Sequence, residues 1–354
     1  MDQGARADDT HSLYDVRPSA AAPPIEPLEA AGYRPIASAT PHRGWLALCR
    51  PRTFPVALLP ALITLALLAA RGTPLRPLSA LSTLLAVALV LAGANMLDEY
   101  LDYMRARAHA GASERMDSSY RMGNRLKNAG VRPLTALRLS IALLLIGALA
   151  GVPAARSGGT PLIMLGAVGL LAAFLYSSTT YALKHLPLGE LTLALAIGPG
   201  VTTATALAQG QRLTVPVALL GAGFGLLTLA LAQAAHLRGA EVDRAYGRRT
   251  LAVLAGARFA RILYVTCLLG GLALIVLIGL MRGGAPGFVA VLLALPAALL
   301  ALTGVTRARA PNARDLAVRL TLRAYLWIGT LALLGLLLRA VITAALPLLL
   351  NALG

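Results

Sequence analysis

Long runs of apolar residues, separated by short polar segments, form the dominant pattern along the chain. Each run has roughly the 17 to 25 residues that a helix needs to cross a hydrocarbon core of about 30 Å. The pattern predicts nine transmembrane helices, near 53–70, 78–97, 138–155, 161–182, 189–208, 213–235, 262–281, 286–304 and 322–345. Arg339 and Pro347 interrupt the end of the chain, which predicts either one long tilted helix or a shorter helix with an interfacial tail.

The residues before the first run differ in composition. Residues 1–44 are rich in Ala, Pro and scattered charges, with neither an apolar run nor a signal-peptide pattern. They are predicted to be a disordered cytoplasmic tail, followed by a transmembrane domain over 45–354. Over the whole chain 57% of residues are hydrophobic, 13% are charged and the mean hydropathy is +0.71. These values are typical of an all-α polytopic membrane protein.

The formal net charge of +17 indicates basic loops rather than a nucleic-acid partner. Only 5% of residues are aromatic, so side chains on which bases stack are scarce. Six of the 32 Lys and Arg residues fall on the side of the membrane opposite the tail: Arg71, Arg76, Arg156, Arg212, Arg282 and Arg339. By the positive-inside rule the tail's side is cytoplasmic, which predicts an inner-membrane protein with a cytoplasmic N-terminus.

The acidic residues are distributed even more unevenly. Nine lie beyond the tail, and the predicted topology places all of them on the cytoplasmic side: Asp98, Glu99, Asp102, Glu114, Asp117, Glu190, Glu241, Asp243 and Asp315. Acidic residues contribute little to topology, so their gathering on one side indicates a function.

The segment NMLDEYLDY, residues 95–103, carries the densest group of acids. On a helix Asn95, Asp98 and Asp102 form one stripe, with Glu99 beside it. Carboxylates this close repel one another and persist best around a divalent cation. Oxygen ligands favour Mg²⁺, which proteins usually hold with one or two carboxylates and substrate phosphates. The alternative interpretation is a solvated helix end with ordinary surface acids.

Basic residues follow this segment closely. Seven lie in the next loop: Arg105, Arg107, Arg115, Arg121, Arg125, Lys127 and Arg132. Arg and Lys bind phosphate oxygens through charge-assisted hydrogen bonds. Acids for a metal followed by bases for phosphates predict a diphosphate site, although the positive-inside bias explains some of these residues.

A second polar cluster, HLRGAEVDRAYGRRTLAVLAG, covers residues 236–256. The periodicity of the sixth helix continues into Asp243, and Gly247 is predicted to end it. His236, Gly239 and Asp243 then share one stripe, whereas Glu241 points elsewhere. Three arginines suited to phosphate follow: Arg244, Arg248 and Arg249. An even number of helices separates the two clusters, so both are predicted on the same side.

These two clusters resemble the Asp-rich motifs of the UbiA superfamily of intramembrane prenyltransferases. The first family motif, N-x-x-[ND]-D-x-x-D-Y, is matched by Asn95, Asp98, Glu99, Asp102 and Tyr103. The second, D-x-x-x-D-R-x-x-G-[KR]-R-T-L-A-V, is matched by Asp243, Arg244 and Gly247 to Val253. The resemblance covers most of 45–350. Residues 50–62 and 176–200 are similar to the branch that prenylates 1,4-dihydroxy-2-naphthoate in menaquinone biosynthesis.

The sequence departs from the family pattern at three places. Gly239 stands where the family has the first Asp of its second motif, and Ala235 and His236 fall near the usual Asn or Asp at its start. Glu99 replaces an Asp in the first motif. A second Mg²⁺ is therefore bound more weakly through Asp243, or His236 or Glu241 substitutes, or the protein catalyses other chemistry.

The resemblance implies nine helices around a cavity open to the cytoplasm and Mg²⁺-dependent transfer of a prenyl group from a polyprenyl diphosphate to an aromatic acceptor. It implies metal ligands at Asn95, Asp98, Glu99, Asp102 and Asp243, of which Asp98, Asp102 and Asp243 are predicted to be catalytic. Diphosphate is predicted to contact Arg121, Arg125, Lys184, Arg248 and Arg249. Two alternatives remain open: a terpene cyclase of the same superfamily that needs no acceptor, and a transporter of an anionic amphiphile.

Overall fold

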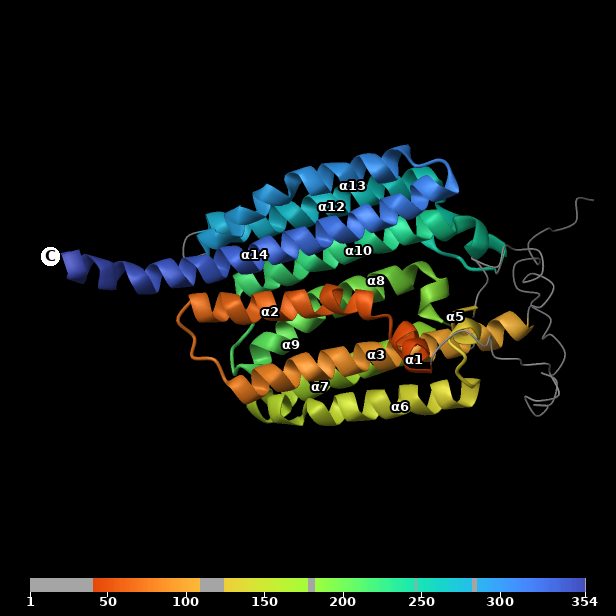
Figure 1. The fold of residues 1–354 in the computed structure, drawn as a ribbon, viewed down its shortest axis with the longest axis horizontal. Coiled ribbons are helices and arrows are strands. Elements are labelled where there is room, and N and C mark those ends of the chain that lie inside the picture. Colours follow the sequence, from red (N-terminus) through yellow and green to blue (C-terminus); the bar gives the residue numbers. More distant parts are fainter. Residues whose placement is uncertain (1–40, 109–123, 178–181, 246, 282–284, 354) are drawn as a thin grey trace, which may run out of the picture. The chain divides into compact units, whose positions relative to one another are not determined.

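The computed structural model describes residues 41–108, 124–177, 182–245, 247–281 and 285–353, all within the unit Ile36–Gly354. Long helices dominate these residues: α2 (Phe54–Ala70), α3 (Pro77–Ala108), α6 (Pro133–Ala150), α7 (Val152–Ser177), α10 (Val215–Ala245), α12 (Gly256–Leu280), α13 (Leu295–Arg307) and α14 (Pro311–Leu353). Shorter helices connect or extend them: α1 (Pro41–Cys49), α5 (Asn124–Asn128), α8 (Pro187–Leu195), α9 (Val201–Ala208) and α11 (Leu251–Leu254). Figure 1 shows the long helices running side by side.

The described residues contain nine helical segments long and apolar enough to cross a membrane, one for each predicted run. The prediction of an all-α polytopic membrane protein is therefore confirmed. Three of the nine segments are composite. The first, Gly44–Ala70, joins α1 to α2 through a 3-10 helix, Pro51–Thr53. The fifth joins α8 to α9 through a π-helix, Ala196–Gly200, and the eighth joins a 3-10 helix, Pro286–Ala294, to α13. The first helix, α1, begins at Pro41, inside the last residues of the predicted tail; residues 1–40 lie outside the described part.

Two helices extend well beyond the ends of their apolar runs. The run at 78–97 continues as α3 to Ala108, and the run at 213–235 continues as α10 to Ala245. Gly247, at φ 67°, follows the end of α10, as predicted. Only Gly adopts this left-handed conformation without strain, which explains why the helix ends here. Both polar motifs consequently lie on helix extensions rather than in irregular loops.

Small residues allow one pair of segments to approach very closely. A Cβ atom on Gly198 would lie 2.3 Å from the carbonyl oxygen of Gly221 and 2.4 Å from the backbone nitrogen of Gly225. Gly221 and Gly225 on α10 have the four-residue spacing of small residues that permits close helix packing, and both contact the π-helix here. Pro199, which has no backbone N–H, adds a local interruption beside this contact.

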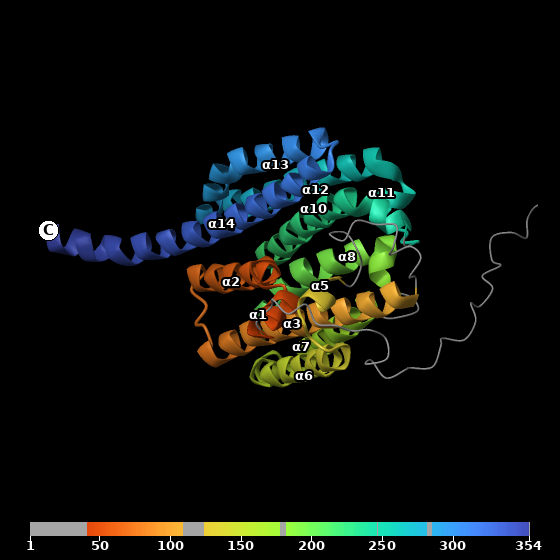
Figure 2. The same cartoon turned by 45° about the vertical axis from the view of Figure 1, so that its right-hand side comes forward.

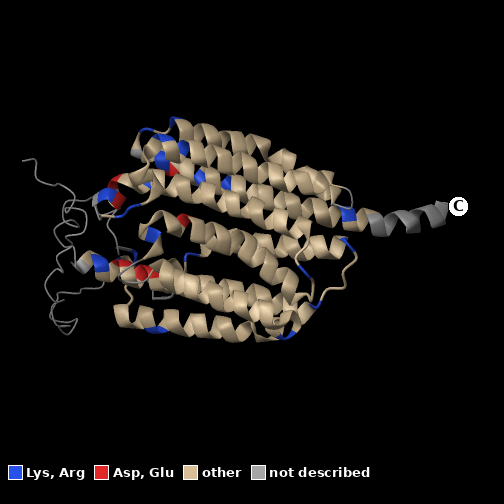
Figure 3. Ribbon diagram, turned by 180° about the vertical axis from the view of Figure 1, so that it is seen from behind, with Lys and Arg blue, Asp and Glu red and all other residues tan. Residues whose placement is uncertain are grey.

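Helix α10 packs against α12 and α14 on one side and against α8 on another, whereas α3 packs mainly against α6 and α7. Figure 2 shows the same arrangement from a second direction. The largest apolar cluster joins α2, α10, α12, α13 and α14, and a smaller one joins α1, α3, α5 and α6. The described acidic residues gather at one end of the helices (Figure 3). That end carries the candidate site.

Candidate active site

The acids of the first motif are inside the protein rather than on a solvated helix end. Asp98 and Glu99 on α3 are 6% and 3% exposed, and Asp102 is partly buried one turn later. Buried carboxylates are costly unless cations or hydrogen-bond donors satisfy them. The alternative that Asp98 and Glu99 are ordinary surface acids on a solvated helix end is therefore wrong. The residues that contact these two carboxylates define the site.

Asp98 and Asp102 converge on the ammonium of Lys184. The Lys184 Nζ atom contacts Asp98 Oδ1 and lies 2.5 Å from Asp102 Oδ1. Lys184 belongs to the 3-10 segment Leu183–His185 and is 7% exposed. Ser177, at the end of α7, donates its hydroxyl to Asp98 Oδ1 at 2.7 Å. Two carboxylates from successive turns of α3 therefore aim oxygen atoms at one cation.

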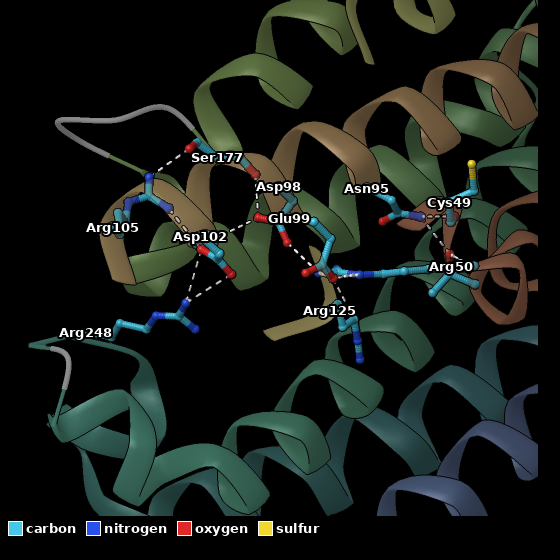
Figure 4. Close-up of polar contacts among 12 residues, drawn as sticks. Cys49, Arg50, Asn95, Asp98, Glu99, Asp102, Arg105, Arg125, Ser177 and Arg248 are labelled. Carbon is cyan, nitrogen blue, oxygen red and sulfur yellow. Dashed lines mark hydrogen bonds and ion pairs between the residues drawn. The ribbon is translucent and has the colours of Figure 1, made fainter. Parts of the chain in front are cut away.

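Glu99 faces a different pair of cations (Figure 4). Arg50 donates to Glu99 Oε1 at 2.8 Å through Nε and at 2.5 Å through Nη2, and its Nη2 also donates to Asp98 Oδ2 at 2.8 Å. Arg125 Nη1 lies 2.9 Å from Glu99 Oε1. Arg50 was missed by the sequence reasoning, although it begins the segment 50–62. Its backbone is left-handed, at φ 51° and ψ 62°, a conformation that costs a non-Gly residue about 1–3 kcal/mol and is typical of functional sites.

Arg248 connects the two motifs. Its Nη2 lies 3.5 Å from both carboxylate oxygens of Asp102, and its Nη1 lies 3.3 Å from Asp243 Oδ1. Figure 4 shows Arg248 approaching Asp102 from the opposite side to Arg105, whose Nη1 donates to Asp102 Oδ1 at 3.1 Å. The prediction that both clusters open on the same side is therefore confirmed, and the link between them is a guanidinium.

The second motif has the predicted helical stripe. Asp243 is 5% exposed, and His236 Nδ1 lies 3.4 Å from its Oδ2 atom. A Cβ atom at Gly239 would lie 3.8 Å from the same oxygen, an ordinary contact distance. Glu241 points to another face, as predicted, and pairs with Arg314 at 2.9 Å. Glu241 is thus not placed to replace the missing acid.

Glu190, on α8, joins this second group although sequence reasoning gave it no role. It is 1% exposed, accepts from the side chain of Gln233 and from the backbone N–H of Leu251 at 3.2 Å, and lies 3.9 Å from His236 Nδ1. These contacts connect α8, α10 and α11. The sequence did contain a signal that Glu190 belongs to the site, because it is an isolated acid within the segment 176–200.

Three predicted residues are placed elsewhere or cannot be placed. The Asn95 amide donates to the Cys49 carbonyl and to Thr53 Oγ1, each at 3.0 Å, so it is directed towards the segment before α2. The Arg249 backbone N–H donates to the His185 carbonyl at 2.7 Å, while the residue itself is exposed. Arg121 lies outside the described residues.

The cations around the site also affect His185, which follows Lys184. Burial and the positive charges of Arg248, Arg105 and Lys184 lower the pKa of His185 from 6.5 to about 3. The imidazole is therefore neutral at pH 7. Its Nε2 atom is buried and has no hydrogen-bond partner among the described residues.

The donor atoms present suit a hard cation bound together with a substrate. Among the described residues no group of three or more His, Cys, Asp or Glu side chains is arranged to hold a metal. Mg²⁺, however, is usually held by one or two carboxylates plus phosphate oxygens, and Asp98 and Asp102 already direct one oxygen each at a common positive charge. These two residues fit the ion as placed, whereas Glu99 is turned towards Arg50 and Arg125.

The model of the UbiA prenyltransferase family matches residues 57–327, which is most of the chain. The chain belongs to the UbiA prenyltransferase family. This confirms the resemblance seen in the two motifs and makes the protein a prenyltransferase, so the transporter alternative is wrong.

Two curated relatives of this UbiA-family prenyltransferase carry the same name, 1,4-dihydroxy-2-naphthoate octaprenyltransferase. The one from Bacillus subtilis is 27% identical over 69% of this chain and 76% of its own length. The one from Mycobacterium leprae is 28% identical over 82% of this chain and 97% of its own length. A solved UbiA homologue from Archaeoglobus fulgidus, bound to DMAPP and Mg²⁺, is 16% identical and superimposes with a TM-score of 0.55, covering 81% of this chain and 99% of the other. That likeness shows a shared fold.

Proposed function

We propose that this UbiA-family prenyltransferase transfers a prenyl group from a polyprenyl diphosphate to 1,4-dihydroxy-2-naphthoate, with Mg²⁺, at the cytoplasmic side of an inner membrane. The observation that carries the proposal is the single polar network that joins Asp98 and Asp102 of the first motif to Asp243 of the second through Lys184 and Arg248. The names of the relatives support the acceptor.

The cations in this network have a second use during binding. Lys184, Arg50 and Arg248 now neutralise carboxylates. If Asp98 and Asp102 held Mg²⁺, the same cations would become available to the oxygens of the diphosphate. Such an exchange would leave these charges paired in both states, which would avoid the cost of an isolated buried charge.

Asp98 and Asp102 would hold the ion, with Asp243 contributing from the second motif. When bound, Mg²⁺ supplies charge that stabilises the diphosphate as it leaves. Lys184 and Arg248 add fixed positive charge at the same place, which favours the leaving group most strongly when its charge is largest. Asn95 acts at a distance by fixing the segment before α2, from which Arg50 reaches Asp98.

The reaction breaks the bond between the allylic carbon and the diphosphate oxygen, and the diphosphate leaves with the electron pair. The electron-rich ring then forms a bond to the allylic carbon, and loss of CO₂ returns an electron pair to the ring. A membrane site suits this chemistry because the isoprenoid tail remains in lipid and water is kept from the carbocation. The predicted central cavity for the acceptor remains a prediction.

The test uses protein purified in detergent, Mg²⁺, polyprenyl diphosphates of several lengths, and either 1,4-dihydroxy-2-naphthoate, 4-hydroxybenzoate or no acceptor. Mass spectrometry of the products should show faster prenylation of the naphthoate, with loss of CO₂, than of the benzoate. An Asp102→Asn protein serves as the matched control. If prenyl diphosphate is consumed equally fast without acceptor and a cyclic hydrocarbon is released, the protein is a cyclase and the proposal is wrong.

A further inference from the structure

A second basic site lies on a different face of α10 from the one that carries His236 and Asp243. A pocket of about 180 Å³ is enclosed by α10, α12, α14 and the end of α13. Four arginines line it: Arg238 and Arg244 on α10, Arg261 on α12 and Arg314 on α14. Five alanines form much of the remaining wall and leave room for a ligand between the helices.

The positive charges of this pocket exceed its negative charges. The only lining carboxylate within the described residues is that of Glu241, which is 73% exposed and pairs with Arg314 at 2.9 Å. Arg238 lies 3.6 Å from Asp315, and both side chains are about a third or more exposed, at 41% and 32%. Exposed pairs of this kind contribute little, about 0–1 kcal/mol, so a bound anion can replace them.

Among the four arginines, Arg261 gives the strongest indication of a bound ligand. Its Nε atom is buried and has no hydrogen-bond partner among the residues that the structure describes. A buried donor without a partner is costly and needs an explanation, such as a ligand that accepts from it. The surplus of guanidinium groups in the pocket indicates that this ligand is a phosphate, because a guanidinium group binds two phosphate oxygens through a pair of hydrogen bonds.

The pocket lies near the ends of the apolar segments that surround it. Arg238 and Arg244 lie on the extension of α10 beyond its apolar run, Arg261 lies in the second turn of α12 and Arg314 in the first turn of α14. In a bilayer the ends of transmembrane segments lie close to the phospholipid phosphates, and basic pockets between transmembrane helices bind anionic headgroups.

The two sites use different faces of α10. His236 and Asp243 are directed at Glu190 and Arg248, whereas Glu241 is directed at Arg314. The helix itself therefore separates the pocket from the candidate active site. We infer that the pocket among Arg238, Arg244, Arg261 and Arg314 binds the phosphate of an anionic phospholipid. This inference does not depend on the proposed acceptor or on the metal.

Native mass spectrometry of the whole protein in a neutral detergent tests the inference. The probes are phosphatidylglycerol, phosphatidylcholine and inorganic phosphate, each titrated separately. The variants are Arg261→Gln and Arg314→Gln, which remove one pocket charge each. Arg258→Gln is the matched control, because Arg258 is an exposed residue of the same helix that does not line the pocket.

The wild-type protein and Arg258→Gln should bind phosphatidylglycerol more tightly than phosphatidylcholine, and Arg261→Gln should weaken that binding about tenfold, as expected for loss of one charge-assisted hydrogen bond. Arg261→Lys should retain part of the affinity. Thermal midpoints measured without lipid establish that the variants fold. If Arg261→Gln does not fold, Arg314→Gln is used as the test variant in its place. Equal binding of the two lipids, or unchanged binding in both pocket variants, would overturn the inference. Binding of inorganic phosphate as tight as that of phosphatidylglycerol would also overturn it, because the ligand would then be a soluble anion.

Discussion

The two polar motifs of this protein differ in how their charges are balanced. The first, on α3, has three acids within five residues, and each contacts at least two cationic side chains. The second, at the end of α10, directs one acid into the site, Asp243, whose partners are one guanidinium and an imidazole. The comparison indicates that the first motif is built to exchange protein cations for a metal, and that the second contributes mainly through Arg248 and Asp243.

The largest effect is expected from an isosteric change in the first motif. Asp102→Asn removes a carboxylate aimed at Lys184 and should lower kcat on the order of 10²- to 10³-fold, the range for losing one preorganised electrostatic group. The decrease in kcat caused by Asp243→Asn should be about tenfold smaller. Steady-state rates at saturating Mg²⁺ provide the measurement. Equal losses in the two variants would show that the motifs share the metal equally.

The second prediction separates the two uses of Lys184. Lys184→Met removes a cation for the diphosphate, so KM for the prenyl diphosphate should rise roughly 30-fold or more, as for a buried charge partner. It also removes the competitor for Asp98 and Asp102, so half-maximal activity should need less Mg²⁺. Lys127→Met, at an exposed position of α5, is the control. A higher Mg²⁺ requirement in Lys184→Met would contradict the exchange of charges.

The third prediction restores an acid to the second motif. Gly239→Asp places a carboxylate beside Asp243, and a Cβ atom there meets nothing closer than 3.8 Å. The Mg²⁺ concentration for half-maximal rate should fall roughly fivefold, which corresponds to a gain of about 1 kcal/mol in the free energy of Mg²⁺ binding. Gly239→Ala, which adds only the methyl group, should leave the requirement unchanged. If both variants behave alike, the second motif does not bind metal.

The smallest effect concerns His185, which lies between the two motifs. Its pKa in the folded protein is about 3, below the ordinary 6.5, so the unfolded chain takes up the proton first. The neutral imidazole therefore contributes its full stability above about pH 6.5 and loses it as pH falls towards 3. Thermal midpoints between pH 8 and 5 should decline less steeply for His185→Asn than for the wild type. Parallel curves would show that His185 is not held neutral by these cations.

The sequence predicted the helices well because the length of an apolar run is a direct consequence of membrane thickness. It also predicted the stripe of His236, Gly239 and Asp243, since helical periodicity alone determines which residues share a face. It did not predict the ion pairs of Arg50, or the contact of Lys184 with both Asp98 and Asp102. Those contacts join segments distant in the sequence, and periodicity carries no information about which segments meet. Arg125, Arg248 and Arg249 were predicted as diphosphate ligands, and these roles stay predictions.

Metal binding to the intact protein tests the asymmetry between the motifs most directly. Mn²⁺ titration followed by electron paramagnetic resonance, with an unreactive geranyl thiodiphosphate present, counts bound ions without turnover. The tightest bound ion should disappear in Asp102→Asn and persist, more weakly held, in Asp243→Asn. Retention of that ion in Asp102→Asn together with its loss in Asp243→Asn would show that the second motif, not the first, holds the metal.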